Sequence, residues 1–314
     1  MKFGKIVFLL MALFLVLTLA SCENNSKKAS EGLAFISNGD GTCVLEDIGS
    51  CEDADIVIPS VSPTGDRVVE IGEGAFDNCK NITSVSIPNS VTSINGSAFF
   101  GCTGLTSIFI PRSVTSIDGS AFEMCTGITS IKVAANNPSY YSKGNCLIAK
   151  NPKSLVFGCK GSVIPDGVTS IGEDAFYGCT DLTDIIIPDS VETIGVCAFS
   201  ICKGLTTITV PNSVTRIEMF AFSNCTGLTS IALSNSITCI EEGTFLECIS
   251  LNSVSIPGGI TSIEQNAFSE CTGLTSITFQ GTMAQWEGVV LGTNWNYNVP
   301  ATVVHCTDGD VSIK

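Results

Sequence analysis

The chain has 314 residues, with 15 Lys and Arg, 30 Asp and Glu and one His, which gives a formal charge of −15. Nucleic acid is excluded as a main partner, because binding to a phosphate backbone depends on Lys and Arg that replace its counterions. Disorder is excluded too, since only 14% of the residues are charged and 44% are hydrophobic, which leaves ample apolar surface to form a core.

Residues 1–21 are typical of a secretion signal. Lys2 and Lys5 precede an apolar run over residues 6–20, which is shorter than the roughly 20 residues that span a bilayer. The sequence that ends this run, Leu-Ala-Ser-Cys, resembles the bacterial lipobox, which implies cleavage before Cys22 and lipidation of its thiol. An ordinary signal peptide followed by a chance cysteine is the alternative.

We expect residues 22–32 to be a flexible, lipidated tether, because this segment is short and polar. The residue after the cysteine is Glu23 rather than aspartate, which favours the outer membrane. The sequence therefore predicts an exported protein that is anchored to the bacterial envelope by lipid alone and exposed at the cell surface.

Residues 33–66 are predicted to form an N-terminal cap. The turn signal Asn38-Gly39-Asp40-Gly41 separates two apolar runs, which indicates a hairpin ahead of a strand over residues 56–59. Several acidic residues in this segment could hold calcium, but they lack the spacing of an EF-hand loop, so a solvated surface is favoured. They are Asp40, Glu46, Asp47, Glu52 and Asp53.

Residues 67–279 contain a 23-residue repeat of the form VTxIxxxAFxxCTGLTxIxIPxS. Its phenylalanines recur every 23 positions, except that 54 positions separate Phe122 from Phe176, so one coil is extended by eight residues, at about 132–165. The alternation in LxxIxI predicts a short strand that proline ends. A single coil cannot bury its own apolar residues, so about nine coils are expected to stack into an α/β-type or mainly β solenoid.

The unit AFxxCTGLTSIxIPxSVTSI resembles the leucine-rich repeat of the BspA-type bacterial surface proteins. The resemblance extends over residues 67–279, and the flanking segments are also similar to that family. It implies a non-catalytic solenoid that is displayed on cells and binds proteins, such as host extracellular matrix or other cell-surface proteins. It names no particular ligand.

Residues 280–314 are predicted to form a C-terminal cap, with a short helix over residues 284–290 and a hairpin at Asp308-Gly309. We interpret Trp286 and Trp295 as core residues, with exposed ligand contacts as the alternative. The single histidine, His305, would be needed for a Ser-His or Cys-His mechanism, but a strand residue of the hairpin is the simpler interpretation. We therefore expect no enzyme activity and no cofactor.

Eight of the sixteen cysteines occupy one repeat position, where we expect buried thiols that contact backbone carbonyls rather than a row of disulfides. Parallel Cβ vectors on stacked coils suit a disulfide poorly. This thiol ladder consists of Cys79, Cys102, Cys125, Cys179, Cys202, Cys225, Cys248 and Cys271. Outside it, Cys43 with Cys51 is the best disulfide candidate, and Cys146 with Cys159 is a weaker one. The spacing does not suit zinc, so no metal site is expected.

The middle residue of each IxI should point outward, and this position varies between copies while the core positions do not. Phe109 and Ile186 place apolar side chains there. Exposed apolar groups with charged neighbours are typical of an interface, although isolated exposed hydrophobic residues without a role are an equal alternative. Our candidate ligand-binding residues are Phe109, Arg112, Lys132, Ile186 and Asp189, together with Tyr140 and Tyr141 of the extended coil. A structural envelope scaffold is the alternative function.

Overall fold

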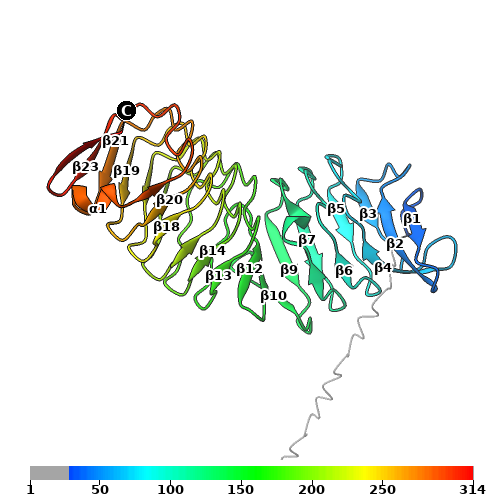
Figure 1. The fold of residues 1–314 in the computed structure, drawn as a ribbon. Coiled ribbons are helices and arrows are strands. Elements are labelled where there is room, and N and C mark those ends of the chain that lie inside the picture. Colours follow the sequence, from blue (N-terminus) through cyan, green and yellow to red (C-terminus); the bar gives the residue numbers. More distant parts are fainter. Residues whose placement is uncertain (1–27, 314) are drawn as a thin grey trace, which may run out of the picture.

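The computed structural model describes residues 28–313, and the predicted signal peptide and the lipidation site Cys22 lie outside this range. The described part is a mainly-β solenoid of about 11 turns (Figure 1). Within this part, no helix is long and apolar enough to cross a membrane. The single α-helix there, α1, extends over Met283–Glu287, and a 3-10 turn, η1, covers Gly119–Phe122.

Two columns of short strands extend along the solenoid. The first is built mostly from the VTxI part of the repeat and comprises β2 (Thr42–Asp47), β4 (Arg67–Ile71), β6 (Ser93–Ile94), β8 (Ser116–Ile117), β12 (Ser154–Phe157), β13 (Ser170–Ile171), β14 (Thr193–Ile194), β16 (Arg216–Ile217), β18 (Cys239–Ile240), β20 (Ser262–Ile263) and β22 (Val290–Leu291). Within this column, paired strands are parallel and in register with the repeat, as with Ile94 and Ile117.

The second column, called here the strand face, is built from the IxI part of the repeat. It comprises β3 (Asp55–Val57), β5 (Ser84–Ser86), β7 (Ser107–Ile110), β9 (Ser130–Val133), β15 (Thr207–Thr209), β17 (Ser230–Ala232), β19 (Ser253–Ile256), β21 (Ser276–Phe279) and β23 (Val303–Cys306). In β7 and β19 the burial alternates between exposed and buried residues, as expected for strands with one face in the core. The middle residue of IxI therefore points outward.

The core between the columns is built around stacked phenylalanines. Neighbouring rings in the regular coils lie 5.1 to 5.8 Å apart between centroids and are within 17° of parallel. This spacing follows from the strand separation of about 4.8 Å, which sets the coil-to-coil distance. The glycine of the TGL motif permits this close approach, because a Cβ on Gly127 would collide with the carbonyl oxygen of Thr103 in the preceding coil.

The two caps continue the stack, which brings the nine expected coils to about 11 turns. At the N-terminus, β1 (Ala34–Ser37) and β2 form the predicted hairpin, but β2 also pairs in parallel with β4, and β3 pairs with β5. At the other end, β22 and β23 pair in parallel with β20 and β21, and β24 (Gly309–Ser312) closes the sheet as a hairpin. Each cap therefore adds a coil whose sequence does not match the repeat.

Two predicted boundaries also shift. The tether ends before Ser30, which is buried and exchanges hydrogen bonds with the backbone of Val57 in the N-terminal cap. The helix predicted over residues 284–290 is shorter, because Thr282 and Gln285 form a capping box at its start and Gly288 is its C-cap. Both Trp286 and Trp295 are buried, with ring centroids 5.9 Å apart, and Trp295 packs against Phe268 at the end of the ring stack.

The extended coil divides the solenoid into two arms, which meet at an angle near β9, β10 and β12 (Figure 1). It forms a hairpin of β10 (Tyr140–Lys143) and β11 (Cys146–Ala149), and β11 pairs with β12. The core separates into two clusters at this coil. Here Phe157 packs on Phe122 at a 36° tilt, and Gly158 lies against the ring of Phe176. We call this region, residues 119–190, the seam.

Candidate protein-binding surface

The outward positions of the strand face are exposed, and those of the later coils carry small side chains. Phe109 is 52% exposed and Ile186 is 85% exposed, whereas Thr209, Ser255 and Thr278 occupy the equivalent position in later coils. A third apolar residue, Val163, is 68% exposed and was missed from the sequence. It lies 23 positions before Ile186, and the shared form of SVIPDG and IIIPDS could have revealed it.

Val163 and Ile186 line an open groove of about 790 Å³ between the extended coil and the next coil. The groove floor is mostly apolar, because the buried side chains of Ile164, Ile185 and Ile187 line it together with the buried Ser162. Three acidic residues stand on its rim: Asp166, Asp184 and Asp189. The seam therefore combines exposed apolar side chains with a hollow that a ligand could fill.

The backbone that borders the groove forms no strand. Every other repeat from residue 84 to residue 279 forms a strand at the IxI position, but residues 162–164 and 184–187 do not. Within the described structure, the backbone N–H and C=O groups of residues 184–187 make no hydrogen bond. The same holds for those of Ile164, whereas Val163 N–H donates to the carbonyl of Gly144, which does not line the groove. These groups are therefore open to a partner.

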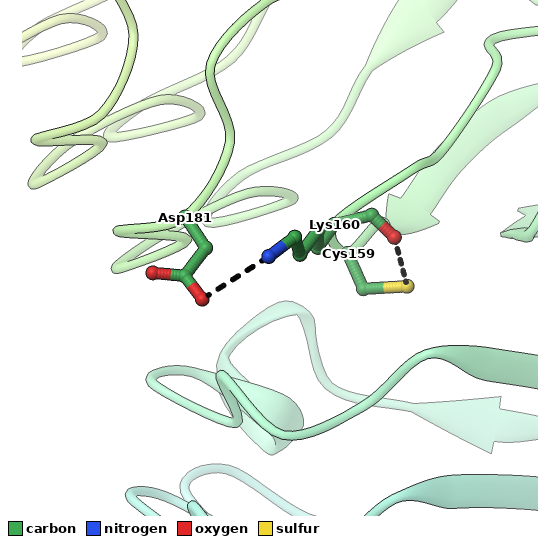
Figure 2. Close-up of polar contacts among 3 residues, drawn as sticks. All are labelled: Cys159, Lys160 and Asp181. Atoms are coloured by element: carbon green, nitrogen blue, oxygen red, sulfur yellow. Dashed lines mark hydrogen bonds and ion pairs between the residues drawn. The ribbon is translucent and has the colours of Figure 1, made fainter.

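An ion pair joins the two coils beside the groove. Lys160 of the extended coil lies 3.6 Å from the Asp181 carboxylate of the next coil, and Cys159, buried beside it, contacts the Lys160 carbonyl (Figure 2). Among residues 28–313, Asp166, Asp184 and Asp189 make no such ion pair. The residues that line the groove include these three aspartates and no Lys or Arg, so its rim carries a net negative charge.

The other predicted ligand-binding residues are only partly brought together. Phe109 and Lys132 are direct neighbours on β7 and β9, and Asp189 shares the groove with Ile186. Arg112 lines a separate hollow of about 610 Å³ with Asn89 and Asn136. The strand face thus presents two separate clusters rather than a single one.

Tyr140 was wrongly included among the ligand-binding residues. It is buried, and its hydroxyl accepts a hydrogen bond from the backbone N–H of Ile117 at 2.9 Å. The extended coil leaves this N–H of β8 facing the hairpin, and the Tyr140 hydroxyl satisfies it. Tyr141 is half-buried against the core of the C-terminal arm. Both tyrosines therefore hold the hairpin in place.

On the opposite side of the seam, two carboxyl groups from neighbouring coils meet. Burial, followed by the charge of Asp174, raises the pKa of Glu123 to about 7. Burial, followed by the charge of Glu173, raises the pKa of Asp174 to about 6, and the two carboxyls are hydrogen-bonded to each other. The extended coil has no AF turn of its own on this side. The turns that follow Phe122 and Phe176 are therefore direct neighbours, and Met124 N–H donates to the Tyr177 carbonyl.

The cysteines of the repeat position are free in the structure. Six of them are buried, and each donates its Sγ–H to the carbonyl of a phenylalanine in the preceding coil at 2.9 to 3.2 Å: Cys102, Cys125, Cys202, Cys225, Cys248 and Cys271. Cys79 and Cys179 are half-buried and make longer contacts. Burial raises the pKa of Cys225 to about 12, so its thiol stays protonated.

The predicted disulfides are absent from the described structure. Cys43 and Cys51 are both free, because Cys43 on β2 faces the next coil and donates to the Asp66 carbonyl at 3.6 Å. Cys146 and Cys159 are also free and contact different groups, the Val163 carbonyl and the Asn145 side chain. Among residues 28–313, no cluster of three or more His, Cys, Asp or Glu could hold a metal ion.

His305 lies in β23, and its Nδ1 is 2.9 Å from the Asp310 carboxylate on the neighbouring strand β24. Both side chains are exposed, at 46% and 59%. This pair closes the terminal hairpin and lies far along the solenoid from the seam (Figure 1).

The chain belongs to the family of BspA type leucine rich repeats, whose six copies match residues 60–168 and 169–290. Its fold is similar to that of a leucine-rich repeat protein from Eubacterium ventriosum, with a TM-score of 0.59, 21% identity and coverage of 90% of this chain and 98% of the other. The pneumococcal vaccine antigen PcpA is similar as well, with a TM-score of 0.57, 18% identity and coverage of 81% and 56%. No curated protein matches the chain in sequence. The recognition of the family and of the solenoid from sequence is confirmed.

Proposed function

We propose that this protein is a non-catalytic surface lipoprotein that binds proteins of host or neighbouring cells through its strand face. The observation that carries the proposal is the set of large, exposed apolar residues, Phe109, Val163 and Ile186, at positions that carry small residues in the later coils. Large exposed apolar side chains with charged neighbours are typical of protein interfaces.

Two further facts support the proposal. Leucine-rich repeats generally mediate protein–protein interactions, and their stacked strands give an extended surface that suits a protein partner. The sequence of residues 1–22 supports export and lipid attachment at Cys22, since acyl chains at the N-terminus anchor a protein while leaving its folded part free. Such an anchor would hold the solenoid outside the cell, where partners of this kind occur.

Protease treatment of intact cells tests the location. The full-length protein should be cut while a periplasmic control protein survives. Survival of both proteins would place the solenoid in the periplasm and remove the adhesion proposal, leaving an envelope scaffold as the function.

Binding to immobilised surface proteins tests the activity. The purified mature protein should bind a subset of them saturably, and Phe109→Ser or Ile186→Ser should weaken binding about tenfold by removing buried apolar area. Thr209→Ser, at the equivalent position of a regular coil, is the matched control. The proposal fails if binding is not saturable, or if Phe109→Ser and Ile186→Ser both bind as tightly as the wild type and the Thr209→Ser control.

A further inference from the structure

We infer that the groove between residues 162–164 and 184–187 binds an extended, basic peptide segment of a partner protein, which pairs as an added strand with the unpaired backbone of residues 184–187. This inference rests on the proposed function and specifies its binding mode. It depends on three properties of the groove that the regular coils do not combine.

The first property is the unpaired backbone. Residues 184–187 form no hydrogen bond through their N–H and C=O groups within the described structure, although the equivalent residues 207–209 form β15 and pair with β17. In the open groove water can bond to these peptide groups, and a strand that docks beside them replaces that water with N–H and C=O partners. An extended peptide fits this requirement better than a helix, whose backbone bonds are already made.

The second property is the side-chain lining. Ile186 and Val163 project outward at 85% and 68% exposure, and Ile164, Ile185 and Ile187 form the floor. A strand that lies in the groove presents alternate side chains to its two faces. Apolar residues at every second position would therefore meet this lining, while the residues between them would face solvent.

The third property is charge. Asp166, Asp184 and Asp189 stand on the rim without an ion pair, whereas the nearby Lys160 is held by Asp181. The whole chain carries −15, which adds to the negative potential at the groove. Lys or Arg at the outward positions of the peptide would be attracted, and acidic residues there would be repelled.

Synthetic peptides of about eight residues, the length of a strand, provide the test with the purified mature protein. One peptide alternates Val with Lys and Thr, and its control has Glu in place of Lys. The Lys peptide should bind at least about tenfold more tightly than the Glu peptide at low salt, and the difference should shrink as salt screens the charges. Equal binding of the two peptides, or binding of neither, would overturn the inference.

A modified form of the Lys peptide tests strand pairing directly. Methylation of its backbone amides leaves every side chain in place but removes the N–H donors, and should weaken binding about tenfold or more. Hydrogen exchange should show that the bound peptide protects the amides of residues 184–187. Full affinity after methylation would show that the peptide does not bind as a strand.

Variants of the protein locate the site. Val163→Thr and Ile186→Thr introduce the residue found at the same position in Thr209 and Thr278, so they should preserve the fold, and each should weaken peptide binding about tenfold. Phe109→Thr, outside the groove, should change it less than about twofold. The opposite pattern would move the site to Phe109 and overturn the inference.

These outcomes are separable from those of the proposed function. If surface proteins bind the chain and only Phe109→Ser weakens this binding, then the proposal of protein binding holds and the groove inference fails. If the mature chain forms a dimer that Ile186→Thr converts to a monomer, a second copy occupies the groove, and the inference of a peptide ligand is wrong.

Discussion

The regular coils over residues 191–279 and the seam over residues 119–190 are built from the same repeat. They differ in how regularly their rings pack and in how many of their polar groups have hydrogen-bond partners. In the regular coils, phenylalanine rings stack nearly parallel and ladder thiols reach carbonyls of the preceding coil. At the seam, the ring stack is tilted, two adjacent strand-face segments form no strand and two half-buried carboxyls meet. A single insertion of eight residues thus concentrates the exceptions, and with them the candidate site, in one place.

The largest expected difference between the regions concerns the ring stack. Phe222→Ala should lower the free energy of unfolding by about 3–5 kcal/mol, because its ring contacts Phe199 and Phe245 on both sides at 5.3 and 5.8 Å. Phe157→Ala at the seam should cost about 3 kcal/mol or less, since its ring stacks on Phe122 alone, at a tilt. Chemical denaturation of both variants measures this. An equal loss would show that the seam is packed as tightly as the regular coils.

Thiol labelling gives the next largest contrast. Burial raises the pKa of both Cys225 and Cys179 to about 12, but Cys225 is fully buried, whereas Cys179 at the seam is half-buried and its Sγ lies 3.6 Å from the Gly158 carbonyl. Because the two thiols are equally weak acids, only exposure separates them, and Cys179 should react about tenfold faster with iodoacetamide in the native protein, as measured by mass spectrometry. In denaturant the two should react alike, which provides the control. Faster labelling of Cys225 would contradict the assignment of a buried ladder.

The carboxyl pair predicts a pH dependence that belongs to the seam. The pKa values of Glu123, about 7, and Asp174, about 6, exceed their unfolded values of 4.5 and 3.8, so the folded state binds more protons between about pH 4 and 7. Stability should therefore fall as the pH rises through this window. Glu123→Gln should reduce this pH dependence and raise the free energy of unfolding at pH 8 by about 1 kcal/mol, after allowance for partial exposure. Denaturation at pH 5 and pH 8 measures it.

Glu192→Gln, a change at an exposed position in a regular coil, is the control for this experiment. It should leave the difference between pH 5 and pH 8 as it is in the wild type. A Glu123→Gln variant with an unchanged pH dependence would show that the pair does not contribute to it.

The repeat columns could be predicted from the sequence because every coil buries the same kinds of residue at the same repeat positions. The spacing of 23 positions was enough to place Phe199, Cys202 and the outward direction of Ile186. The caps could not be recognised as coils, since β2, β3, β22 and β23 pair through backbone groups and need no repeat motif. The groove was also beyond prediction, because the separation of two coils depends on how the extended coil packs and not on any local pattern.

The smallest expected effect concerns the ion pair across the seam. Lys160 and Asp181 are 3.6 Å apart, but their side chains are 60% and 59% exposed, so solvent screens the attraction. Lys160→Met should change the free energy of unfolding by less than about 0.5 kcal/mol, with Lys153→Met as an exposed control. A loss above about 1 kcal/mol would show that this pair holds the two arms together. If the expectation holds, the arms are joined by Phe157 and by the backbone bond from Met124 to Tyr177, and the charges beside the groove remain available to a ligand.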